Sequence, residues 1–140
     1  MTKYIIEGAD GVGKTEVVRR LNAENIYCQD RCKKVISKYM VFDISIYDRV
    51  HIYYSKCLNK DCKVIFLINN NEIELLKRIH NRKIIDEYDL MTNEFNRLYL
   101  ETYKYIKTLD VLKDMFYMID VTNLSIEEQT NKVKNLILKG

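Results

Sequence analysis

The stretch Lys3-Tyr-Ile-Ile-Glu-Gly-Ala-Asp-Gly-Val-Gly-Lys-Thr15 decides the fold of this chain. Its first five residues are mainly β-branched or aromatic, which predicts a strand from Lys3 to Glu7, and a helical pattern follows from Lys14 to Glu24. Between them, Gly8 to Thr15 match G-x-x-x-x-G-K-[ST] without a gap. Glycines let the backbone wrap a phosphate, and a helix N-terminus adds amide donors and a positive dipole. The stretch therefore predicts a strand, a phosphate-binding loop and a helix.

The chemistry expected of this loop is that of a nucleotide-phosphate site. Lys14 is expected to reach the β- and γ-phosphates of ATP, and Thr15 to offer its hydroxyl to Mg²⁺. The remaining loop residues are expected to surround the phosphates through their backbone. The predicted loop contacts to ATP are Gly8, Ala9, Asp10, Gly11, Val12, Gly13, Lys14 and Thr15.

The rest of the chain alternates strand-like and helix-like segments. Further strands are predicted at Ile26–Cys28, between Met40 and Tyr47, at Lys63–Ile68 and at Met115–Asp120. Helices are predicted at Cys32–Lys38, Val50–Leu58 and Glu72–Asn81, from Asn93 to about Leu109, and after Ser125, which stands in capping-box register with Glu128. This order predicts one three-layer α/β domain over residues 1–140, with a mainly parallel sheet of about five strands flanked by helices.

Composition narrows the possible partners. The 140 residues are 47% apolar and 31% charged, with a formal net charge of +3, which falls short of the dense basic patch of a nucleic-acid binder. No apolar run is long enough to span a bilayer, and the first residues lack a signal-peptide pattern, so we expect a cytoplasmic protein without a membrane partner. The spacing of the four cysteines predicts neither a disulfide nor a zinc site: Cys28, Cys32, Cys57 and Cys62.

The loop is more specific than its general pattern. Glu7 to Thr15 resembles the start of thymidylate kinases, which read E-G-x-D-G-x-G-K-T. The resemblance implies that Asp10 binds the 3′-hydroxyl of an acceptor deoxyribose; related deoxynucleoside kinases usually carry Asn there. The alternative is that Asp10 only stabilises the loop turn.

A second matching element is Ile46-Tyr47-Asp48-Arg49, interpreted as a strand end followed by an acid–arginine pair. The resemblance implies that Asp48 and Thr15 hold Mg²⁺, and that Arg49 binds the acceptor or the transferred phosphate, for which a guanidinium is well suited. Asp43 follows another apolar run and is a rival to Asp48, and an ordinary surface salt bridge is a further alternative.

A third matching element is Leu75 to Arg82, which is similar to the L-x-x-R-I-x-x-R segment that opens the lid of these kinases. A lid-like segment is therefore expected at about residues 78–92. Arg78 and Arg82 lie four residues apart, on one helix face, where they are expected to close over ATP and stabilise charge on the transferred group. The alternative is a solvated basic face.

The remaining matches to the kinase family, and the departures from it, concern the ATP-binding and acceptor-binding parts of the site. Residues 117–123 resemble the final strand and the adenine-facing loop, so Thr122 and Asn123 are expected to contact ATP. Glu16 is also expected to contact ATP; it stands where the family contacts the α-phosphate through Thr or Ser, and Tyr53 stands where Ser is usual. Asp30 is aligned with an acid that faces the acceptor, and the stretch from there to Asp48 is shorter than in the family.

Together these features predict an enzyme that uses ATP and Mg²⁺ to phosphorylate a deoxynucleoside monophosphate. The catalytic residues expected are Lys14, Asp48, Arg49, Arg78 and Arg82, and the acceptor-binding residues are Asp10, Asp30 and Arg49. One alternative is a deoxynucleoside kinase in which Asp30 or Asp48 deprotonates a 5′-hydroxyl. Another is an ATP-binding module without catalysis. Relatives are commonly homodimers, so a homodimer is a further expectation.

Overall fold

A computed structural model describes residues 2–9, 11–30, 45–57, 61–82 and 89–139 of the chain. Its sheet contains β1 (Lys3–Gly8), β2 (Cys28–Asp30), β3 (Cys62–Ile68) and β4 (Phe116–Asp120). All neighbouring strands are parallel, in the order β2-β1-β3-β4. The described residues thus form four strands, where the sequence predicted about five.

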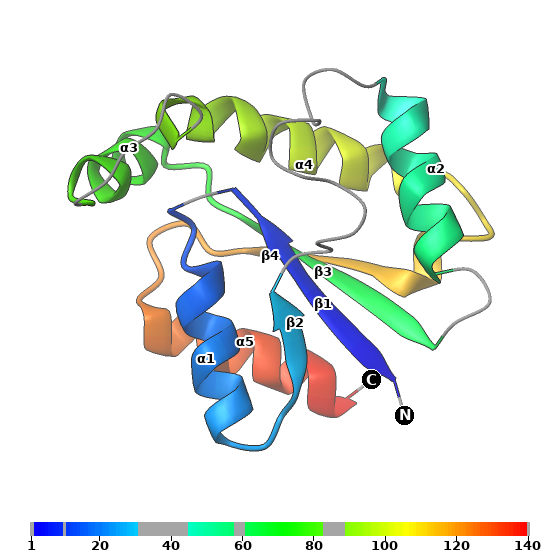
Figure 1. Ribbon diagram of the computed structural model, residues 1–140, viewed down its shortest axis with the longest axis horizontal. Coiled ribbons are helices and arrows are strands. Elements are labelled where there is room, and N and C mark those ends of the chain that lie inside the picture. The colour runs from blue at the N-terminus through cyan, green and yellow to red at the C-terminus, as the bar shows by residue number, and fades with distance from the viewer. Residues whose placement is uncertain (1, 10, 31–44, 58–60, 83–88, 140) are drawn as a thin grey trace.

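The described residues form five α-helices, and these lie on both faces of the sheet (Figure 1). Figure 1 shows α1 (Lys14–Ala23) and α5 (Ile126–Lys139) together on one face, and α2 (Ile46–Cys57) and α4 (Thr92–Ile106) on the other, with α3 (Glu72–His80) beside the start of α4. Two short 3₁₀ turns, η1 (Asp89–Met91) and η2 (Lys113–Met115), flank α4. The predicted α/β class with a parallel sheet between helices is confirmed. None of the helices in the described ranges is long and apolar enough to cross a membrane.

The core forms where both faces of the two central strands are covered. The segment from Val64 to Ile68 in β3 is almost entirely inaccessible to solvent, as expected for a parallel strand between two helical layers. An apolar stripe of α4 packs on this strand, and its residues Phe95, Tyr99 and Ile106 are buried in the core.

Local capping signals fix the starts of three helices. Asn71 accepts the backbone N–H of Glu74 at the start of α3. Ser125 and Glu128 exchange two 3.1 Å hydrogen bonds at the start of α5, which confirms the cap predicted there. Ser45 caps α2, since its hydroxyl accepts the backbone N–H of Asp48 at 3.2 Å. The predicted strand between Met40 and Tyr47 is therefore wrong for Ile46 and Tyr47, which are helical; residues 40–44 lie outside the described ranges, as does the predicted helix at 32–38.

The connections from the two central strands diverge at the carboxyl end of the sheet (Figure 1). β1 and β3 are neighbours, with Gly8 level with Leu67. β1 leads to α1 on one face of the sheet, whereas β3 leads to α3 on the other face (Figure 1). Ligands of parallel α/β sheets bind outside the carboxyl ends of strands at such a point of divergence. The predicted phosphate loop lies at this point.

Candidate functional site

The loop between β1 and α1 packs closely against two helices, against α3 at Gly11 and against α5 at Gly13. Gly11 and Gly13 have φ angles of 89° and 103°, which L side chains rarely adopt. A Cβ on Gly11 would lie 3.3 Å from the carbonyl oxygen of Leu75 in α3, and one on Gly13 would lie 2.7 Å from Cδ1 of Ile126 in α5. The loop is therefore built into the fold, between α3 and α5.

A pocket of about 390 Å³ opens above this loop. It brings together most of the predicted loop residues with both arginines of the third sequence element. Ile126 is an additional lining residue that the sequence did not indicate. The lining residues are Ala9, Gly11, Gly13, Lys14, Thr15, Glu16, Arg78, Arg82 and Ile126.

Asp30 joins the two polar side chains at the start of α1. Its carboxylate accepts a hydrogen bond from the Thr15 hydroxyl at 2.9 Å and lies 3.7 Å from Nζ of Lys14. Lys14 is only 6% exposed and also donates to the Gly8 carbonyl at 3.1 Å. The lysine is thus held inside the loop, and the acid at the end of β2 lies beside the predicted metal-binding hydroxyl.

The donor set of this cluster fits Mg²⁺. The Thr15 hydroxyl and the Asp30 carboxylate supply hard oxygen atoms, which Mg²⁺ prefers. No group of three or more His, Cys, Asp or Glu side chains that could hold a metal ion occurs in the described parts of the chain. A metal ion here would therefore complete its coordination with phosphate oxygens and water, as Mg²⁺ does in phosphoryl-transfer sites.

The structure places Asp48 in a helix, whereas the sequence predicted a strand end there. Asp48 lies in the first turn of α2, exposed, and its carboxylate accepts a hydrogen bond from the Ser45 hydroxyl at 3.1 Å. The pattern Ser45-x-x-Asp48 is a capping box, a signal that the apolar residues around it obscured. In the described residues it is Asp30 that lies beside Thr15; the rival Asp43 lies outside the described ranges.

Arg49 is buried on the inner side of α2. It is 4% exposed, and its Nη2 lies 3.7 Å from the carboxylate of Glu101 on α4. It does not line the pocket above the loop. One helical turn later, the hydroxyl of buried Tyr53 donates a hydrogen bond to Glu7, the fully buried residue before Gly8. This Tyr53–Glu7 pair was not predicted, although an acid within an apolar strand is a signal for it.

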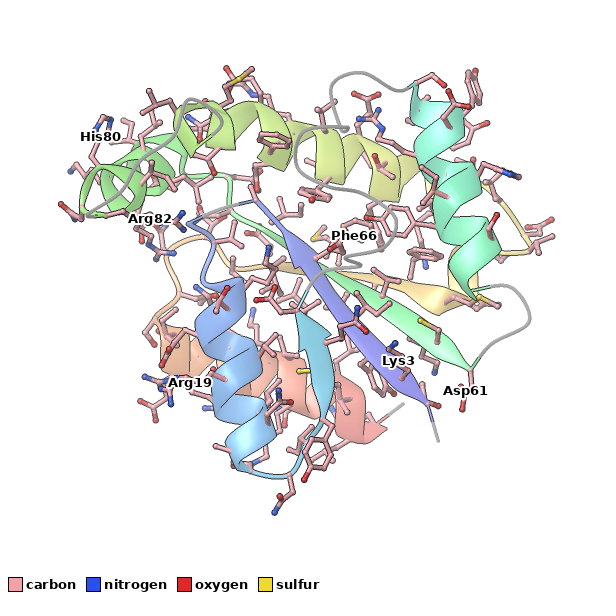
Figure 2. The ribbon with its side chains drawn as sticks, viewed as in Figure 1. Lys3, Arg19, Asp61, Phe66, His80 and Arg82 are labelled. Carbon is pink, nitrogen blue, oxygen red and sulfur yellow. The ribbon has the colours of Figure 1, made fainter. Side chains whose placement is uncertain are left out.

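The two arginines of the third element differ in what they contact. Arg78 in α3 donates from Nη1 to the Gly11 carbonyl at 2.9 Å and forms an ion pair with Glu74 on the same helix. Arg82 follows the end of α3, is exposed and lines the pocket. Figure 2 shows Arg82 on the side of α3 nearest the loop, with His80 pointing away from it.

Glu16 lines the pocket from the first turn of α1, and its carboxylate is engaged by its own helix. Arg19 donates from Nε at 3.0 Å and Arg20 from Nε at 3.1 Å. These hydrogen bonds, first from Arg19 and then from Arg20, lower the pKa of Glu16 from 4.5 to about 2. A negative charge therefore stands where the resemblance implied contact with an α-phosphate.

Thr122 and Asn123 lie in the loop between β4 and α5, outside the lining of the pocket. The Thr122 hydroxyl donates to Asp120 at 2.5 Å and accepts the backbone N–H of Asn70 at 2.8 Å. The bonds from Thr122 lower the pKa of Asp120. This network fixes the loop that leads to Ile126 in the pocket wall.

Asp10 lies outside the described residues, so its contact with an acceptor sugar stays a prediction.

Two of the four cysteines, Cys28 and Cys62, carry free thiols. Burial, with a smaller contribution from Asp30, raises the pKa of Cys28 to about 11. Cys32 lies outside the described ranges, and the side chain of Cys57 is likewise not described.

Comparisons with known proteins bear on the fold alone. No protein-family model matches the chain, and no curated protein matches it. Among solved structures, an uncharacterized protein from Eubacterium ventriosum ATCC 27560 is similar, with a TM-score of 0.51 and 11% sequence identity over 99% of both chains. The chain thus shares an overall fold with that protein across its length.

Proposed function

We propose that this protein is an ATP-dependent phosphotransferase of the P-loop kinase fold, with a deoxynucleoside monophosphate as its preferred acceptor. The observation that carries the proposal is the contact of Asp30 with both Thr15 and Lys14 at a loop whose glycines are held by α3 and α5. A loop of this sequence, preformed beside a carboxylate, matches what a magnesium–nucleotide complex requires.

The chemistry of the pocket suits phosphoryl transfer, which depends mainly on positioning and on stabilising negative charge. Lys14 and Arg82 supply cations, and the N-terminus of α1 supplies amide donors and a positive dipole. Thr15 and Asp30 would hold Mg²⁺, which neutralises charge on the β- and γ-phosphates when bound. Asp30 also keeps the Lys14 ammonium close to the loop before nucleotide binds.

A monophosphate acceptor suits this site because its attacking oxygen is already ionised and needs no general base. Such an acceptor needs a further cation, and Arg49 is the candidate. It lies one turn from Tyr53, which contacts Glu7 at the end of the phosphate-loop strand, so it is on the side of α2 that faces the sheet. The 3′-hydroxyl partner proposed for the acceptor is Asp10.

A second candidate is a deoxynucleoside kinase, and one observation favours it. Asp30 lies beside Lys14 at the carboxyl end of β2, where a carboxylate can accept the proton of a 5′-hydroxyl. The hydrogen bond from Thr15 favours the metal role for Asp30, so we place this candidate second.

The test is an initial-rate panel of the four deoxynucleosides and their monophosphates with ATP and Mg²⁺. Lys14→Ala, purified in parallel, controls for contaminating kinases. Faster turnover on a monophosphate than on its nucleoside, reduced in Arg49→Ala, supports the first candidate, whereas the reverse order supports the second. Binding of ATP without turnover on any acceptor would indicate a nucleotide-binding module without kinase activity. Absence of ATP binding would refute the proposal.

A further inference from the structure

We infer that Arg78 is a positioning residue that fixes the phosphate loop through the Gly11 carbonyl, while Arg82 is the arginine of this segment that meets the ligand. The inference about Arg82 rests on the proposed function, whereas the inference about Arg78 concerns the ligand-free loop. It assigns different roles to two arginines that the sequence places in one motif.

Both terminal nitrogens of the Arg78 guanidinium have protein partners in the ligand-free structure. Nη1 donates to the Gly11 carbonyl at 2.9 Å, and Nη2 pairs with the carboxylate of Glu74, one turn earlier on α3. Both Arg78 and Glu74 are partly buried, with side chains 29% and 31% exposed. The ion pair balances the charge of Arg78 within α3 and orients the Arg78 guanidinium toward the loop.

The hydrogen bond to Gly11 determines the orientation of the next peptide plane. Because a trans peptide is planar, a Gly11 carbonyl that faces Arg78 directs the N–H of Val12 to the opposite side. That N–H donates to the Ala9 carbonyl at 3.3 Å and closes the turn of the loop. Arg78 therefore stabilises the turn that leads into the amides at the start of α1.

The packing of α3 on the loop supports the same role. Leu75 and Ile79 are fully buried and lie beside Gly11, where a methyl group added to the glycine would meet the Leu75 carbonyl at 3.3 Å and Ile79 side-chain carbons at 3.6 Å. Val12 is also fully buried. Arg78 lies on the same helix as Leu75 and Ile79, so α3 holds the loop by a polar bond and an apolar contact.

Arg78 and Arg82 both line the pocket, and they differ in exposure. Arg82 follows α3, its backbone N–H donates to the Ile79 carbonyl at 3.0 Å, and its side chain is exposed (Figure 2), whereas the side chain of Arg78 is 29% exposed. A guanidinium in this position meets an anion that enters the pocket. The N-terminus of α1 begins at the same cavity and adds its positive dipole to the charge of the guanidinium.

The test measures backbone amide hydrogen exchange in the ligand-free protein, and Mg·ATP affinity by calorimetry, for Arg78→Ala, Arg78→Lys and Arg82→Ala. Loss of a hydrogen bond from a charged donor should raise exchange at Val12 to Thr15 by about 10- to 100-fold in Arg78→Ala. Arg78→Lys should restore much of the protection, and Arg82→Ala should leave loop exchange within about twofold while weakening Mg·ATP binding by about tenfold or more.

Two results would overturn the inference. One is unchanged loop exchange in Arg78→Ala, to within about twofold, together with a loss of ATP affinity, which would mean that Arg78 acts on the ligand directly. The other is a rise in exchange across β1 and β3 as large as that in the loop, which would mean a general loss of stability. If the unmodified protein binds no ATP, the proposed function fails, and the exchange data still decide the role of Arg78.

Discussion

Asp30 and Thr15 are joined by a 2.9 Å hydrogen bond, in which the Thr15 hydroxyl donates to the Asp30 carboxylate. The contact links the end of β2 to the first turn of α1, and the parallel pairing of β2 with β1 makes it possible. It places the acid of the candidate site on β2, whereas the motif Asp48-Arg49 begins a helix on the other face of the sheet.

We expect Asp30→Asn to reduce Mg²⁺-dependent turnover by about 10- to 100-fold or more, since loss of a residue that only orients a metal ligand already costs that much and Asp30 is proposed to hold the metal itself. The amide keeps an acceptor for the Thr15 hydroxyl and removes the charge. Turnover measured across a Mg²⁺ titration checks this. Asp48→Asn is the matched control, because Asp48 bonds with Ser45 in a helix cap, and it should stay within about twofold of the unmodified protein. A larger loss in Asp48→Asn would reverse the assignment.

We expect Lys14→Ala to reduce phosphoryl transfer by about 100-fold or more, because it removes the cation that meets the phosphates in this loop. Lys3→Ala is the control. Lys3 is an exposed residue at the start of β1, at the opposite end of that strand from the phosphate loop (Figure 2), and its loss should leave turnover unchanged. Initial rates and thermal melting are measured together. A rate for Lys14→Ala within about tenfold of the original would contradict the role of the loop.

Gly13→Ala should destabilise the protein more than Gly11→Ala does. Both glycines have positive φ angles, a backbone cost of roughly 1–3 kcal/mol for other residues. At Gly13 the new methyl would also lie 2.7 Å from Ile126 and 2.8 Å from Gln129, whereas at Gly11 the nearest atom is 3.3 Å away. Urea denaturation of both variants gives the free energies of unfolding. Equal losses of unfolding free energy in the two variants would show that α5 moves to accommodate the methyl group of Gly13→Ala without further destabilisation.

The ion pairs of Glu16 should make a small, pH-dependent contribution to stability. Its folded-state pKa is about 2, below the ordinary 4.5, so the contribution is present above about pH 4.5 and is lost as the pH falls toward 2. The unfolding free energy of Glu16→Gln should therefore differ from that of the unmodified protein near neutral pH and converge with it in acid. Added salt should reduce the difference, because the pairs are exposed. A difference that is constant with pH would contradict this explanation.

Several elements were predictable because their signals are local. The strand at β3 follows from a continuous apolar run, and the starts of α3 and α5 follow from Asn71 and Ser125, whose caps involve residues three positions away. The apolar period of α4 likewise predicts which of its side chains are buried. Ser45 and Asp48 carry the same kind of signal, and the prediction was wrong there because the apolar residues nearby favoured a strand.

The sequence by itself determined that a glycine-containing loop joins the strand β1 to the helix α1, because strand propensity and glycine conformation depend on neighbouring residues. Only the tertiary structure decided which acid lies beside Thr15 and which helix contacts Gly11. These contacts depend on the strand order β2-β1-β3-β4 and on the faces that α1 and α3 cover. Strand order depends on packing between segments far apart in the chain, and no local spacing specifies it.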